Sequence, residues 1–72
     1  MKTIKVMRLI EECAELQHAL CKAERFGWSN WHPDRPERTN MDDVLDEIND
    51  VERAIQELRD HMALGAAQRV TP

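Results

Sequence analysis

The stretch MDDVLDEINDVERAIQELRDHM, residues 41–62, decides the fold, because its apolar residues recur at alternating spacings of three and four. Residues with this spacing, the a and d positions of a seven-residue repeat, lie on one face of a helix that packs against other helices. The alternation holds through seven apolar residues: Met41, Val44, Ile48, Val51, Ile55, Leu58 and Met62. The sequence therefore predicts a long helix with a continuous apolar stripe.

The ends of this helix are marked by residues that favour helix termini. Thr39 or Asn40 is the predicted N-cap. Asp42 and Asp43 follow in the first turn, where carboxylates complement the positive end of the helix dipole. Gly65 is the predicted end of the helix.

A second helix is predicted upstream, from about Thr3 to Phe26. Its a and d positions also alternate at three and four residues: Val6, Leu9, Cys13, Leu16, Leu20 and Ala23. Met7, Ile10 and Ala14 widen the apolar stripe on one flank, so this helix is expected to face more than one neighbour.

The connection GWSNWHPDRPERT, residues 27–39, is longer than the two to eight residues that usually join packed helices. Pro33 and Pro36 exclude a continuous helix there. All three aromatic residues of the chain lie at its head: Phe26, Trp28 and Trp31. We therefore expect two antiparallel helices joined by a long loop.

The length of the chain bears on its assembly. At 72 residues it forms one all-α domain, assigned to residues 1–65, followed by a short tail at residues 66–72. A core of this size is marginal alone, and two helices cover only part of their own apolar stripes. A homodimer that forms a four-helix bundle is the expected solution, with a dimer of dimers as a further option.

Charge and hydropathy exclude several classes of partner. The net charge is −4, which disfavours binding to duplex nucleic acid. Charged residues interrupt every apolar run, so neither a signal peptide nor a membrane span of about 18 residues is predicted. A cytoplasmic location is expected.

The two cysteines are expected to be reduced. Cys13 and Cys21 are eight residues apart on one predicted helix, which separates their Cα atoms by about 12 Å. An internal disulfide needs less than about 7 Å. Cys13 is expected in the core, and the spacing of cysteines and histidines does not suggest a zinc site.

Paired acids occur in the same register on both predicted helices. EECAELQHAL (11–20) aligns with DEINDVERAI (46–55) at an offset of 35 residues. In the seven-residue repeat the first acid of each pair falls at g and the second at c: Glu12 and Glu15, then Glu47 and Asp50. Residues three apart on a helix are neighbours, so each pair borders the apolar stripe.

If the stripes pack together, the two acid pairs approach each other. Carboxylates about 5 Å apart repel by roughly 3 kcal/mol per pair at an effective dielectric near 20, so a cation is expected between them. Hard oxygen ligands suit Mg²⁺ or Mn²⁺. The alternative is that both pairs are solvated helix faces.

The motif EExxE (Glu11, Glu12 and Glu15) followed by ExxD (Glu47 and Asp50) resembles the signature of MazG-like all-alpha nucleoside triphosphate pyrophosphohydrolases. The flanking sequences ALCKAERFG, NWHPDRPERTN and VLDEINDV resemble those of short phage-type members, and the resemblance covers roughly residues 4–62. The resemblance implies a reaction in which Mg²⁺, held by the four acids, assists cleavage between the α and β phosphates of a nucleoside triphosphate. The four acids would form the catalytic centre, and the products would be a monophosphate and pyrophosphate.

Other residues are candidates for contact with that substrate. Lys22 lies two turns beyond Glu15 at the same repeat position, about 10 Å along the axis, which suits a phosphate contact. Arg25 is a second, weaker candidate. Trp31, and to a lesser degree Trp28, could stack on a nucleobase or instead cover the end of the bundle.

Asn40 could touch substrate or only cap its helix.

Two other functions are consistent with the same sequence. One is a non-catalytic helical assembly or regulatory module. The other is a relative that binds metal without turnover.

Overall fold

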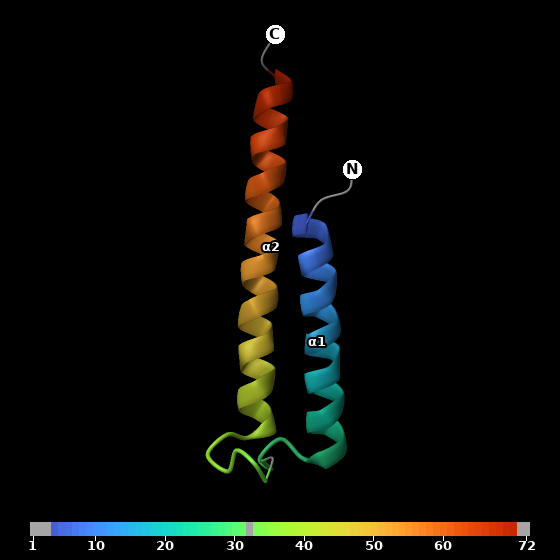
Figure 1. The fold of residues 1–72 in the computed structure, drawn as a ribbon, viewed down its shortest axis with the longest axis vertical. Helices are drawn as coiled ribbons and strands as arrows, with labels where there is room; N and C mark the ends of the chain where they lie inside the picture. The colour runs from blue at the N-terminus through green and yellow to red at the C-terminus, as the bar shows by residue number, and fades with distance from the viewer. Residues whose placement is uncertain (1–3, 32, 71–72) are drawn as a thin grey trace.

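The computed structural model describes residues 4–31 and 33–70, with the backbone alone for 66–70. It is a hairpin of two antiparallel helices, α1 (Ile4–Phe26) and α2 (Asn40–Val70), joined by the loop 27–39 (Figure 1). α2 is the longer helix, with 31 residues against 23, and it extends past the start of α1. The predicted all-α architecture is confirmed.

A reciprocal cap fixes the start of α2. The hydroxyl of Thr39 accepts a hydrogen bond from the Asp42 N–H at 3.2 Å, and the Thr39 N–H donates to the Asp42 carboxylate at 2.9 Å. This is a capping box, in which two N–H groups at the helix start are satisfied at once. Thr39 is thus the N-cap and Asn40 the first helical residue. The same backbone bond is the main cause of the lowered pKa of Asp42.

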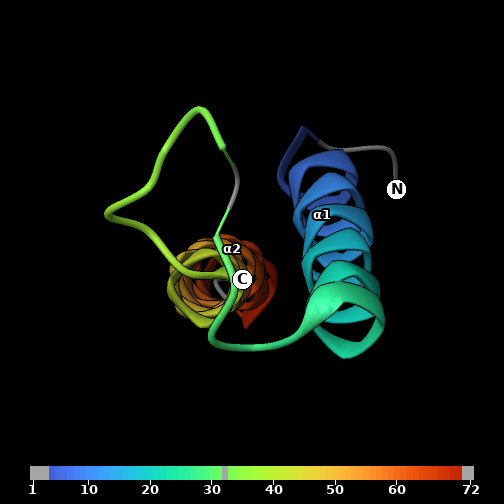
Figure 2. The same ribbon diagram turned by 90° about the horizontal axis from the view of Figure 1, so that it is seen from below.

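The loop is closed at its neck by backbone hydrogen bonds. The Asn40 N–H donates to the Asn30 carbonyl at 2.7 Å, and the Met41 N–H donates to the Trp28 carbonyl at 3.0 Å. Just beyond them, Trp31 and Thr39 form an isolated antiparallel bridge. The rest of the loop swings out to one side of the hairpin (Figure 2). Its tip, residues 33–38, therefore projects from a fixed neck.

The helices face each other through repeat positions d and g rather than a and d. Among the residues whose side chains are described, the buried apolar ones are Ala23, Val44 and Ala54, with exposed fractions of 0%, 3% and 1%. Ala54 occupies a g position, and so does buried Asn40. Small side chains at these positions let the two helices approach closely. Because a hairpin has only two helices, each helix can bury only the side that faces the other.

The a positions lie at one edge of this interface and remain largely uncovered. Five of them are exposed: Cys13, Leu20, Met41, Ile55 and Met62. The prediction that Cys13 lies in the core is therefore wrong for the single chain, and both thiols are free and exposed. With exposed Leu45 and Ile10 at neighbouring e positions, these residues form a surface that we call the apolar edge.

The opposite edge of the interface is formed by the c positions and is charged. Its members include Glu15, Lys22, Asp43, Asp50 and Glu57. Near the start of α1, Glu57 is held by Lys5 at 3.6 Å and by Arg8 at 3.5 Å. We call this surface the polar edge. No helix within the described residues is long and apolar enough to cross a membrane.

The predicted end of α2 at Gly65 is wrong, because the helix continues to Val70. The stretch AAQRV that follows contains good helix formers, and a glycine inside a helix costs only about 1 kcal/mol relative to alanine. Gly27, by contrast, ends α1 with a φ of 101° and an N–H bond to the Ala23 carbonyl at 2.8 Å. Of the two glycines, Gly27 terminates its helix and Gly65 does not.

Substituting alanine at these two glycines should have opposite effects on stability. At Gly27 a Cβ would lie 2.9 Å from the Asn30 side-chain amide on a backbone of positive φ, so Gly27→Ala should destabilise by about 1 kcal/mol or more. At Gly65 nothing lies within 4 Å, so Gly65→Ala should stabilise by up to about 1 kcal/mol. Urea unfolding followed by circular dichroism measures both. Equal effects would contradict the different roles given to the two residues.

Candidate metal centre and adjoining cleft

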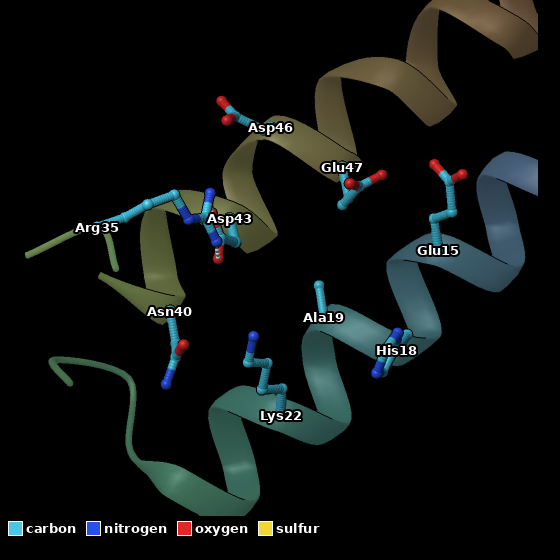
Figure 3. Close-up of a pocket in the computed structure, with 9 residues that line it drawn as sticks. All are labelled: Glu15, His18, Ala19, Lys22, Arg35, Asn40, Asp43, Asp46 and Glu47. Atoms are coloured by element: carbon cyan, nitrogen blue, oxygen red, sulfur yellow. Dashed lines mark hydrogen bonds and ion pairs between the residues drawn. The ribbon is translucent and has the colours of Figure 1, made fainter. Parts of the chain in front are cut away.

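Three of the four predicted metal ligands come together on the hairpin. Glu12 and Glu15 of α1 and Glu47 of α2 each offer a carboxylate oxygen, and these oxygens all lie within 4.8 Å of one another. Figure 3 shows Glu15 and Glu47 reaching toward each other from the two helices. Glu12 and Glu47 occupy g positions, so the d and g packing of the hairpin is what joins the acids from the two helices.

Two oxygens of this cluster are buried without a partner. Oε2 of Glu12 and Oε2 of Glu47 are shielded from solvent, and no N–H or O–H group of the described residues donates a hydrogen bond to either when the cluster is ionised. Acidic groups on exposed helix faces are common without any ion, so the cluster alone says little. An unpaired buried carboxylate oxygen is different, because its lost hydration has no compensation.

The same burial raises the pKa of both carboxyl groups. For Glu12, desolvation is the largest cause, followed by repulsion from Glu15 and Asp50, while Arg8 acts in the opposite direction. For Glu47, desolvation is again first, followed by repulsion from Glu15, Asp50 and Glu12. In both groups a hydrogen bond of the protonated carboxyl with Glu15 raises the pKa further. The cluster therefore holds more negative charge than its surroundings compensate.

Asp50, the fourth predicted ligand, lies close enough to repel the other acids but has a partner of its own. Its carboxylate accepts a hydrogen bond from Arg53 at 3.3 Å, one turn further along α2. An exposed pair at this spacing contributes only about 0.2–0.5 kcal/mol. Asp50 is therefore free to turn toward the cluster at small cost.

The residues present fit a hard divalent cation. The three glutamates offer oxygen ligands only, and they come from two helices that hold them at close range. Mg²⁺ and Mn²⁺ prefer carboxylate oxygens, and Mg²⁺ commonly keeps room for phosphate oxygens among its ligands. The two unpaired oxygens are the atoms that such an ion would satisfy.

The pKa shifts predict how the metal-free protein responds to pH. Glu12 and Glu47 titrate above 4.5 when folded, so between 4.5 and the raised values the folded state binds more protons than the unfolded state. Stability then rises as the pH falls through that window. The metal-free melting temperature should increase when the pH is lowered from 7 to 5.

The double variant Glu12→Gln/Glu47→Gln serves as the control for this pH response, because it lacks both titrating groups. Its melting temperature should change less with pH than that of the wild type. An unchanged or falling wild-type melting temperature on acidification would contradict the burial of these carboxylates.

A cleft of about 310 Å³ begins at the acid cluster and follows the polar edge toward the loop. Glu15 and Glu47 lie at one end of it, with Lys22 and Asn40 toward the other (Figure 3). The remaining lining residues are His18, Ala19, Arg35, Asp43 and Asp46. The predicted phosphate contact Lys22 is thus in the same cleft as two of the predicted metal ligands.

A second hollow, of about 480 Å³, adjoins the first under the loop. It is lined by Phe26, the last residue of α1, and by the loop residues Asn30, Trp31 and Pro33. Lys22 and Asn40 line both hollows, so the two are neighbours. A path therefore leads from carboxylates, past a lysine, to an aromatic surface that includes Trp31.

The remaining sequence candidates lie less directly in this path. Asn40 is buried, and its side-chain amide donates to the Gly27 carbonyl at 2.8 Å, which ties the loop to α2. Trp28 donates from its indole N–H to Glu24 at 3.0 Å. Neither Trp28 nor Arg25, an exposed residue in the last turn of α1, is among the residues that line the two hollows.

Arg35, which lines the cleft, and Phe26, which lines the second hollow, are among the residues that the sequence did not predict for the site. Phe26 was noted in the sequence only as part of the aromatic group at the head of the loop. Arg35 lies in an irregular loop, where no periodicity relates it to the helices. Its place between two prolines, in HPDRPER, is the one local signal that this segment has a defined shape.

The chain was compared with protein-family models, with curated proteins and with solved structures, and none of them matches. The resemblance to MazG-like pyrophosphohydrolases therefore depends on the quoted motifs alone. The candidate site has to be judged by its own geometry.

Proposed function

We propose that the protein is a Mg²⁺-dependent nucleoside triphosphate pyrophosphohydrolase that cleaves between the α and β phosphates, releasing a monophosphate and pyrophosphate. The observation that carries this proposal is the pair of buried, unpartnered oxygens of Glu12 and Glu47. They lie in an acid cluster that opens into a cleft containing Lys22. The adjoining aromatic hollow suits a nucleobase.

The residues of this site have distinct roles in the proposal. Glu12, Glu15 and Glu47 hold Mg²⁺, or Mn²⁺, with Asp50 as a fourth ligand once it leaves Arg53. The bound ion supplies charge neutralisation of the phosphates, polarisation of the α-phosphoryl group and activation of a water. The raised pKa of Glu12 and Glu47 belongs to the metal-free cluster, and a bound ion would lower it again by supplying the missing positive charge.

Further along the cleft, the ligand meets a cation and then an aromatic surface. Lys22 contacts a phosphate oxygen, because it is half-buried in the cleft and has no ion pair within the described part of the chain. Trp31 and Phe26 offer faces for stacking of the base. Asn40, at the junction of the two hollows, keeps the loop in position for this contact.

A panel of ribo- and deoxyribonucleoside triphosphates, assayed for pyrophosphate with and without Mg²⁺, tests the proposed activity. We expect Mg²⁺-dependent release from at least one member. Silence across the panel, together with a Mg²⁺-induced rise in melting temperature, would identify a metal-binding protein without turnover. Silence without any metal response would favour a non-catalytic helical module, the second candidate, which the apolar edge supports.

We also propose that a second copy of the chain covers the apolar edge and completes a four-helix bundle. The chain exposes 5822 Å², whereas a compact protein of its mass exposes about 4,600 Å². The excess of about 1,200 Å² is larger than the roughly 800 Å² that each partner contributes to a standard interface.

Part of that excess belongs to the end of α2 that extends past α1. Six exposed large apolar side chains of the described residues lie on the apolar edge: Ile10, Leu20, Met41, Leu45, Ile55 and Met62. Because the apolar and polar edges flank opposite sides of the helix interface, a partner on the apolar edge leaves the cleft open. The geometry of a two-fold dimer also suits self-complementary stripes of this kind.

A further inference from the structure

Arg35 reaches the cleft from the tip of the loop. Its guanidinium forms an ion pair with Asp43 at 3.1 Å, with a second, longer contact to the same carboxylate at 3.5 Å. Figure 3 shows this pair across the cleft from Lys22, which rises from α1. The two cations therefore approach the same space from different elements of the fold.

Asp43 does not depend on Arg35 alone. Arg38 also contacts Asp43, from its Nε at 3.5 Å, and pairs with Asp46 as well. If Arg35 turned away, Asp43 would keep one arginine partner. The Arg35 side chain is 49% exposed, and exposed ion pairs contribute little to stability. Exchanging this one contact is therefore inexpensive.

The cleft as it stands is too acidic for a polyphosphate. Four of its lining residues carry carboxyl groups, namely Glu15, Asp43, Asp46 and Glu47, against one lysine and one arginine, Lys22 and Arg35. A divalent ion bound by the glutamates would offset the negative charge at one end of the cleft. At the other end, Lys22 has no ion pair with any described residue, and Arg35 is paired with Asp43.

We propose that Arg35 is a second phosphate contact of the cleft, which exchanges the Asp43 carboxylate for a phosphate oxygen when the ligand binds. Arginine suits this exchange because its planar fork binds carboxylate and phosphate in the same bidentate way. The tip of the loop would then be drawn over the bound phosphates while its neck stays closed. This inference rests on the proposed function for the identity of the ligand.

Inorganic pyrophosphate, titrated calorimetrically into the full chain with Mg²⁺, provides a test that does not need turnover. Arg35→Gln should weaken pyrophosphate binding by about tenfold or more, and Arg35→Lys should restore part of the loss. Arg59→Gln, at an exposed position of α2 away from the cleft, is the matched control and should bind as the wild type does.

The exchange itself is tested at Asp43. Asp43→Asn frees Arg35 and should tighten pyrophosphate binding, and this gain should be clearly smaller in the Arg35→Gln background, where only the loss of one negative charge remains. Asp46→Asn removes a cleft carboxylate that pairs with Arg38 but not with Arg35. Its effect should therefore be the same whether Arg35 is present or not.

The outcomes separate this inference from the proposed function. Pyrophosphate binding that is unaffected by Arg35→Gln, or absent from the wild type, overturns the role of Arg35. A gain from Asp43→Asn that is equally large with and without Arg35 overturns the exchange. If the protein still hydrolyses nucleotides in either case, the proposed function stands although the role of Arg35 is wrong. If pyrophosphate binding depends on Arg35 but no nucleotide is hydrolysed, the role of Arg35 is supported and the proposed enzymatic activity is wrong.

Discussion

Glu47→Gln should reduce pyrophosphate release by at least about 100-fold and raise the stability of the metal-free protein. The substitution keeps the shape of the side chain but removes the charge of an oxygen that is buried without a partner. Loss of a metal ligand stops the reaction, while loss of an uncompensated buried charge makes the metal-free fold more stable. Opposite effects on activity and stability are what a metal ligand at this place requires.

Two measurements check this prediction, namely nucleotide turnover and the melting temperature with and without Mg²⁺. The wild type should gain stability from Mg²⁺ and the variant should gain little. Asp60→Asn, on the outer face of α2 at an exposed f position, is the control, and both quantities should stay near the wild-type values. A Glu47 variant that behaves like the Asp60 variant would mean that both acids are ordinary solvated residues.

The sequence predicted the helices well because their causes are local. The three-four alternation, the prolines of the loop and the Thr39 cap each act within a few residues, and the structure confirms all three. The exception at Gly65 is also local in origin. A glycine near the end of an apolar stripe can either end the helix or lie inside it. At Gly65 the helix-forming residues that follow continue the helix.

The packing of the helices could be predicted only in part, because it depends on which arcs meet. The a and d positions suggested one stripe, but the hairpin uses d and g and leaves a at the edge. Alanines at 19, 23 and 54 are the signal that favours this choice, since small residues permit close approach. Cys13 was placed in the core because that shift was not foreseen.

The site shows the same division between local and long-range information. Glu12, Glu15 and Glu47 could be found because their spacing and their matching register place them beside the apolar stripes. The loop residues could not be placed in this way. Arg35 enters the cleft through a chain path without periodicity, and its position depends on the closed neck between Asn30 and Asn40.

Ile55→Lys should convert the proposed dimer into a monomer, weakening association by about 30-fold or more. Ile55 occupies an a position of α2 on the apolar edge and is 37% exposed in the single chain. Its exposed part would be covered by the second copy, so a lysine there would have to lose hydration against apolar side chains. Sedimentation velocity measures the change directly.

The same substitution should also lower the melting temperature and make it independent of protein concentration, because a hairpin with only three buried apolar residues among those described has little core of its own. Gln56→Lys adds the same charge to the next residue, on the outer face of α2, and should leave the dimer intact. A wild-type chain that is monomeric and melts at one temperature over a hundredfold range of concentration would show that the apolar edge is not a dimer interface. Retained pyrophosphate binding in the Ile55 variant, by contrast, would follow from the geometry, because the cleft lies on the opposite edge and is lined by one chain.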